Sequence, residues 1–140
     1  MRLFNRILSA TGVAFAATAL VAGVAVADAS VTVTPATGLV DGQSVDVAVA
    51  GFGAAEELFV AQCAQPEAGV FLCDMVNVQS LTTDADGAGS ATTTVHATFE
   101  GFDQTGSPVA TVDCATVAGG CLLGAMNHTG SSAFAPISFQ

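Results

Sequence analysis

The chain has 140 residues, of which 12 are Asp or Glu and only two, Arg2 and Arg6, are Lys or Arg, so the formal net charge is −10 at pH 7. Because both arginines stand at the N-terminus, the rest of the chain has no cation other than histidine. This excludes direct binding to nucleic-acid phosphates and to anionic lipid surfaces. We interpret the dispersed acids as a device for solubility rather than as a site for a cationic partner.

Residues 1–29 have the pattern of a secretory signal peptide, with Arg2 and Arg6 followed by an apolar run and then small residues. The alternative is a membrane anchor, because the apolar run is long for a signal. The small residues at its end and the absence of a following positive charge favour cleavage near residues 27–29. We therefore expect a secreted, extracellular protein whose mature domain, residues 30–140, starts at about Asp28 to Ser30.

The mature chain of about 110 residues fits one domain, and we expect a monomer. Its four cysteines predict two disulfides. We favour the local pairing, Cys63 with Cys73 and Cys114 with Cys121, which closes two small loops worth roughly 2 to 3 kcal/mol each. The rival pairing of Cys63 with Cys114 has the separation of an immunoglobulin inter-sheet bridge but lacks its tryptophan. No CxxC motif is present, which argues against a zinc or redox site.

In chain order, the first predicted strand is Ser30–Pro35, where apolar and hydroxyl residues alternate and the final proline indicates a sheet edge. Ser44–Val49 follows with three valines on one face, the period of two of a half-buried strand. Leu58–Cys63 is strand-like. Met75–Leu81 is predicted as another strand from a less regular pattern.

Asp84–Gly87 has the spaced carboxylates and glycine with which a calcium loop begins, but the later ligands are missing, so we interpret it as a hairpin turn. Ser90–Phe99 is the clearest strand, with His96 on its polar face. Val109–Val112 and Ser131–Phe139 complete the set. Short strands at roughly ten-residue spacing, about seven in number and without a helical period, predict an all-β fold, an immunoglobulin-like antiparallel β-sandwich.

No catalytic motif is visible, because the chain has no G-x-S-x-G, no H-E-x-x-H and no P-loop. We interpret His96 and His128 as structural or solvent-facing, and we expect neither an enzyme nor a catalytic cofactor or metal. A binding cleft is the more economical hypothesis, since loops pinned by a disulfide are already ordered before a ligand arrives. Phe71 and Leu72, inside the Cys63–Cys73 loop, suit either its wall or the core.

Six segments carry a resemblance to a known family. They are VTVTPATGLVDGQSVDV (31–47), VAQCA (60–64), LTTDADGAGSAT (81–92), FEGF (99–102), GSPVATVDCATVAGGC (106–121) and AFAPISF (133–139). In this order, over essentially the whole mature chain, they resemble the neocarzinostatin-like apoproteins, which are secreted carriers of enediyne chromophores.

The resemblance implies a seven-stranded sandwich with two local disulfides and a cleft that holds a reactive enediyne non-covalently. The family's role is to protect and export that small molecule, which cleaves DNA after its release, so an acidic protein need not touch DNA itself. A dry, apolar cleft suits this cargo, because it withholds the water, thiols and bases that trigger a strained polyunsaturated ring.

The resemblance also places the family's pocket on this chain, with the two disulfides in its floor and wall; the residues are Phe59, Gln65, Phe71, Val78, Gln104, Leu122 and Met126. Gln65 stands where the best-known member has a tryptophan, and Val78 and Gln104 stand where it has phenylalanines. Extra residues also lengthen the Cys114–Cys121 loop. Loss of aromatic faces removes stacking surface. Either the ligand differs, or the alternative function holds: a secreted interaction or cell-surface module with no enediyne ligand.

Overall fold

The computed structural model describes residues 28–140, so the predicted signal peptide falls almost wholly outside the described part. The regular elements of that part are all strands, so it contains no helix long and apolar enough to cross a membrane. The strands are β1 (Ser30–Thr34), β2 (Gln43–Ala50), β3 (Glu57–Glu67), β4 (Val70–Cys73), β5 (Gln79–Thr82), β6 (Gly89–Val95), β7 (Thr98–Phe102), β8 (Pro108–Asp113), β9 (Cys121–Met126) and β10 (Ser132–Ile137).

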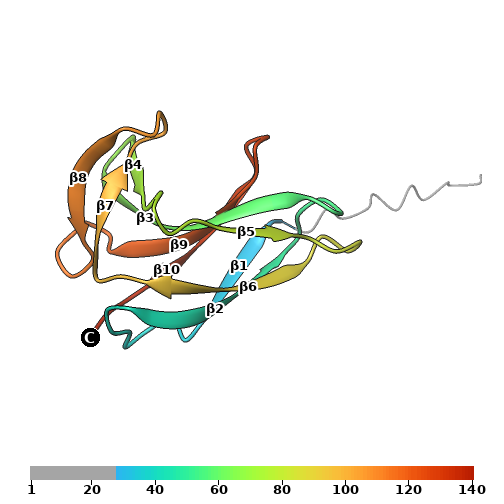
Figure 1. Cartoon of the computed structure of the whole chain (residues 1–140), viewed down its shortest axis with the longest axis horizontal. Helices are drawn as coiled ribbons and strands as arrows, with labels where there is room; N and C mark the ends of the chain where they lie inside the picture. The colour runs from blue at the N-terminus through green and yellow to red at the C-terminus, as the bar shows by residue number, and fades with distance from the viewer. Residues whose placement is uncertain (1–27) are drawn as a thin grey trace, which may run out of the picture.

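Two antiparallel sheets pack face to face, which confirms the predicted β-sandwich (Figure 1). A three-stranded sheet has the order β1-β2-β6, and a seven-stranded sheet has the order β10-β9-β3-β4-β7-β8, with β5 paired to β3 outside this path. Pro136 lies within β10, at the edge of the larger sheet, where the missing amide costs no ladder hydrogen bond. The predicted edge position of the first strand is confirmed in the same way by β1.

The core lies between the sheets and follows the alternation read from the sequence. Val45, Val47 and Val49 of β2 are buried, while the residues between them are exposed. They pack in one cluster with Leu58 of β3 and Leu123 of β9, both almost fully buried. Burial of such side chains contributes roughly 1.5 to 3 kcal/mol each.

Both local disulfides form, as predicted. Cys63–Cys73 joins β3 to its neighbour β4, and Cys114–Cys121 joins the end of β8 to the start of β9. The first bridge therefore lies within the larger sheet, and the second closes the loop between two of its strands.

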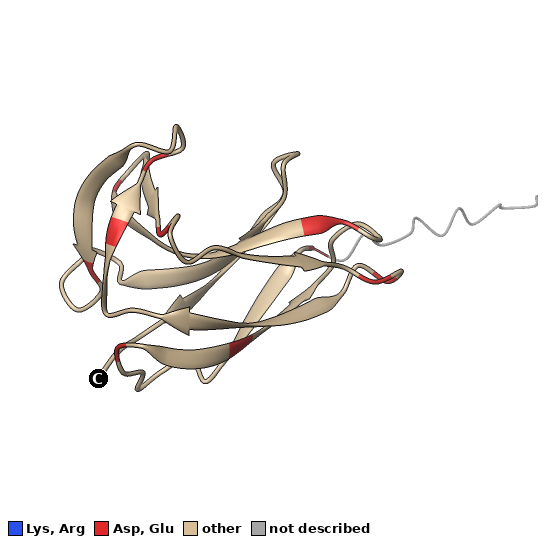
Figure 2. Ribbon diagram, viewed as in Figure 1, with Lys and Arg blue, Asp and Glu red and all other residues tan. Residues whose placement is uncertain are grey.

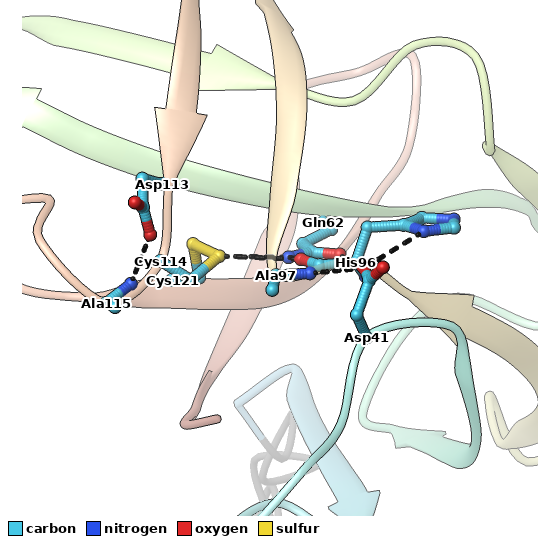
Figure 3. Close-up of a disulfide and its surroundings, with 8 residues drawn as sticks. All are labelled: Asp41, Gln62, His96, Ala97, Asp113, Cys114, Ala115 and Cys121. Carbon is cyan, nitrogen blue, oxygen red and sulfur yellow. Dashed lines mark hydrogen bonds and ion pairs between the residues drawn. A yellow bond between two sulfur atoms is a disulfide. The ribbon is translucent and has the colours of Figure 1, made fainter. Parts of the chain in front are cut away.

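The prediction of one strand over Ser90–Phe99 is wrong, because the chain changes sheets at His96. The buried side chain of Gln62 replaces the ladder there: the backbone N–H of His96 donates to Gln62 Oε1 over 2.9 Å, and Gln62 Nε2 donates to the carbonyl of His96 over 2.6 Å. The next amide, of Ala97, donates to Asp41 Oδ1 over 2.9 Å. Figure 3 shows Gln62 between His96 and the Cys114–Cys121 disulfide.

Two further strand predictions are corrected in detail. Only the end of the predicted Met75–Leu81 strand belongs to a strand, β5, because the buried carboxylate of Asp74 accepts the backbone amides of Val76 and Asn77 and forms a turn. Val76, which looks like a strand residue in the sequence, is 73% exposed. The turn at Asp84–Gly87 is present, but it joins β5 and β6, which belong to different sheets, and so it is no hairpin.

Candidate ligand-binding cleft

The outer face of the seven-stranded sheet is hollowed into a cleft. Figure 1 shows β4, β7 and β8 rising on one side and the loop between β9 and β10 rising on the other. Side chains on β3 alternate between the two faces, so that Leu58 and Val60 point into the core while Phe59 and Ala61 line the cleft. The cavity has a volume of about 910 Å³, which suits a ligand of drug size or larger.

Strand register arranges the residues of this face in rows across β3, β9 and β10. The first row is Phe59, Met126 and Ser132; the second is Ala61, Gly124 and Phe134; the third is Cys63, Leu122 and Pro136. Cys73 and Phe102 extend the third row onto β4 and β7. The cleft therefore rests on a regular sheet, which gives its floor a fixed geometry.

The lining is mostly apolar and rich in aromatic rings and sulfur. It contains four phenylalanines and two methionines, which are Phe59, Phe71, Met75, Phe102, Met126 and Phe134. Val78 and the disulfide-bonded Cys73 also line it. The rings of Phe71 and Phe134 meet edge to face, with centroids 5.1 Å apart. Such a surface suits a flat, polarisable ligand, because rings and thioethers pack favourably on aromatic faces.

One end of the cleft is bounded by the loop after β9. The side-chain oxygen of Asn127 accepts the amides of Thr129 and Ser131 over 3.0 and 2.8 Å, which gives the loop its shape. Asn127 also donates to the carboxylate of Glu56, which attaches the loop to the start of β3. The next residue, His128, is exposed and sets its ring edge to face against Phe59 at 4.7 Å.

The opposite rim carries the turn after β7. Oδ1 of Asp103 accepts the hydroxyl of Thr105 over 2.6 Å and the amides of Thr105 and Ser107 over 2.9 and 3.1 Å. The hydrogen bond from the Thr105 hydroxyl, followed by the amide of Ser107, holds the pKa of Asp103 below its ordinary value. The rim therefore carries a fixed negative charge at neutral pH.

Within the described part of the chain the cleft has no Lys or Arg near it, and His128 is the one basic side chain in its lining. Figure 2 shows acidic residues distributed along the molecule and no Lys or Arg among residues 28–140. His96 approaches Asp41 to 3.6 Å, but it lies at the sheet junction and does not line the cleft. Acidic side chains far outnumber the two histidines in residues 28–140, so an anionic ligand would meet net repulsion.

Five of the seven residues carried over from the family resemblance line the cavity; these are Phe59, Phe71, Val78, Gln104 and Met126. Gln65 and Leu122 do not. Gln65 is exposed where the β3–β4 register shifts between Ala64 and Glu67, and Leu122 is half-buried in the third row.

Sequence reasoning missed Met75, Phe102 and Phe134, although the last two lie in the quoted segments FEGF and AFAPISF. Phe102 and Phe134 supply aromatic surface that the non-aromatic lining residues Val78 and Gln104 do not. Phe71 and Leu72 were equally suited to wall or core, and the structure separates them: Phe71 lines the cleft, whereas Leu72 is 2% exposed in the core. The signal that could have found Phe134 is its place two residues before a strand proline, on the outward-facing parity of β10.

Comparison with known proteins agrees with this architecture. The model of the neocarzinostatin family matches residues 31–139. The antitumor antibiotic C-1027 apoprotein of Streptomyces globisporus is 47% identical over 104 residues, covering 74% of this chain and 71% of that protein. Macromomycin of Streptomyces macromomyceticus is 39% identical over 110 residues, covering 78% and 75%.

Solved structures are similar as well. A structure of macromomycin superposes with a TM-score of 0.75 at 38% identity, covering 80% of this chain and 99% of that one. A structure of apokedarcidin superposes with a TM-score of 0.65 at 35% identity, covering 81% and 100%. The similarity thus extends over nearly the whole length of both solved chains.

Proposed function

Because the chain belongs to the neocarzinostatin family, we propose that it is a secreted apoprotein that binds a labile enediyne-type chromophore non-covalently, stabilises it and carries it out of the cell. The released chromophore is the antibiotic that cleaves DNA, and the acidic protein takes no part in that contact. The protein acts as a monomeric carrier and performs no catalysis. Export removes the signal segment, residues 1–29.

The observation that carries this proposal is the apolar cleft on the outer face of the larger sheet. Its volume of about 910 Å³ and its four phenylalanines suit a large unsaturated ring system. Polar groups are confined to the rim, where Asp103, Gln104 and the Asn127–Ser132 loop stand. A ligand bound on the floor would lose its water, which slows any reaction that needs water or a solvated base.

The chemistry of the lining also suits a reactive cargo. A strained polyunsaturated ring is attacked by thiols and amines, and residues 28–140 contain no free cysteine and no lysine. Sulfur at the cleft is present only as the thioethers of Met75 and Met126 and as the Cys73 disulfide, which are poor nucleophiles. We therefore expect an uncharged or cationic chromophore to survive longer bound than free.

The proposal is tested on protein secreted by its own host and handled cold and in the dark. Residues 28–140 have neither tryptophan nor tyrosine, so the polypeptide itself is nearly transparent in the near ultraviolet. We expect absorption above about 300 nm and an extra native mass, both lost on solvent extraction. A bare monomer mass and a silent spectrum, from a host shown to make no enediyne, would instead favour the interaction or cell-surface module.

A further inference from the structure

The contact between Phe71 and Phe134 crosses the floor of the cleft diagonally. Phe134 comes from the second row on β10, whereas Phe71 comes from β4, beyond the third-row residue Cys73. Between β10 and β4 lie β9 and β3, so the line joining the two rings passes over the third-row residues Leu122 and Cys63. In agreement, Cys63 is 0% exposed and does not line the cavity, and neither does Leu122.

Gly124 gives the Phe134 ring its position. It is the second-row residue of β9 and the register partner of Phe134. A Cβ added at Gly124 would overlap two carbons of the Phe134 ring, so the ring lies directly on the glycine backbone. With the space above Gly124 filled in this way, the ring is held low across the sheet and reaches Phe71.

We infer that the Phe71–Phe134 pair, seated on Gly124, sets the length of the ligand that the cleft accepts. This inference rests on the proposed function, because it concerns the same cleft. On β9 and β10 the pair covers the floor beyond the second row. On β4 and β7 the floor continues to the third-row residues Cys73 and Phe102. The site therefore selects a compact ring system that turns toward β7, and it excludes an elongated one that runs on along β9.

The consequence of removing the pair follows from what it covers. Phe134 is 37% exposed and stands on an edge strand, so its loss removes little core packing. The Phe134→Ala variant uncovers the apolar surface of Leu122 and Cys63 in line with the existing floor. A longer apolar ligand then gains buried area that a short one cannot reach.

Two uncharged fluorescent probes of graded length test the inference: trans-stilbene, and the longer 1,6-diphenylhexatriene, which has the same phenyl ends. Affinities are measured by fluorescence titration of the extracted protein and of Phe134→Ala. We expect the ratio of affinities to move toward the longer probe by roughly tenfold in Phe134→Ala. Methyl resonances of Leu122 should respond to the longer probe in that variant and not in the unmodified protein.

The matched control is Phe102→Ala, which removes an equal aromatic ring from the lining but leaves the Phe71–Phe134 pair intact. It should weaken both probes alike. Phe71→Ala opens the same passage from β4 and should repeat the shift in ratio, which keeps the test decisive if Phe134→Ala does not fold. If the ratio of the two probe affinities is unchanged in both Phe134→Ala and Phe71→Ala while both probes still bind, the inference is overturned and the binding function is not. If neither probe binds the unmodified protein or any of the variants, the binding function is overturned, and this inference with it.

Discussion

The two faces of the central strands β3 and β9 differ in what covers them. On the inner face, Leu58, Val60 and Leu123 are at most 1% exposed beneath the three-stranded sheet. On the outer face, Phe59 and Met126 are as apolar but only half-buried, because no second layer formed by residues 28–140 lies over them. The larger sheet therefore has two hydrophobic faces, and within residues 28–140 only the inner one is covered by another sheet. In the proposed function a small molecule takes the place of the missing layer.

Truncating adjacent residues on opposite faces of β3 should separate the roles of the two faces most clearly. Leu58→Ala leaves a cavity in the core and should lower the free energy of unfolding by about 2 to 5 kcal/mol. Phe59→Ala should cost clearly less stability, since Phe59 is only half-buried, yet it should weaken ligand or probe binding. Urea unfolding and fluorescence titration of the two variants measure both effects. Equal losses of stability with unchanged binding would mean that the outer face is merely a second core.

The two disulfides allow a similar comparison. Replacing Cys63 and Cys73 by alanine, or Cys114 and Cys121 by alanine, should cost roughly 2 to 3 kcal/mol in each case, because the two loops are of similar length. Only the first pair contributes a residue to the cleft. We therefore expect the Cys63/Cys73 variant to lose binding at a temperature where both variants are folded. Equal binding by the two variants would contradict this assignment.

The polar exception on the inner face is Gln62, whose amide supports the change of sheets at His96. Gln62→Leu keeps the volume but leaves the N–H and carbonyl of His96 without partners, and we expect a loss of about 1 to 3 kcal/mol. Calorimetric melting measures this loss, and Gln79→Leu, at an exposed position of β5, is the matched control. If Gln62→Leu is as stable as the control, the hydrogen bonds to His96 do not hold the junction.

The smallest expected effect concerns the rim turn at Asp103. Its folded pKa is lowered, so the stabilisation that its carboxylate provides is complete above the unfolded pKa of about 3.9 and is lost as pH falls through the folded pKa. The amide resonances of Thr105 and Ser107 should therefore titrate with a midpoint below about 3.9. Asp103→Asn should abolish that titration. A midpoint at or above the ordinary value would show that the turn does not favour the ionised carboxyl.

Local patterns predicted the features that depend on neighbours in sequence. The alternating valines of Ser44–Val49 predicted β2 and its buried face, and the cysteine spacing predicted both disulfides. The resemblance to a family, rather than any pattern, placed Phe59, Phe71 and Met126 together, and these residues do line one cleft.

The features that escaped depend on distant partners. The break at His96 needs Gln62, which lies 34 residues away and has no local signature in the strand that it interrupts. The sequence indicates only that Phe134 lies on the outward-facing parity of the last strand, whereas its place in the cleft also needs the β9–β10 register and the space beside Gly124. The wrong start of the predicted Met75–Leu81 strand has a local cause. Asp74 is a turn-forming residue next to it, but the apolar residues that follow favoured a strand in the prediction.

The proposed function places the ligand on the outer face of the larger sheet. Methyl NMR spectra of the protein from its own host, recorded before and after solvent extraction of any bound chromophore, test this position directly. We expect the methyl resonances of Met75, Val78 and Met126 to change on extraction, while those of Val45 and Val47 in the core stay in place. Changes confined to residues far from the cleft, such as the exposed Val40, would contradict the account.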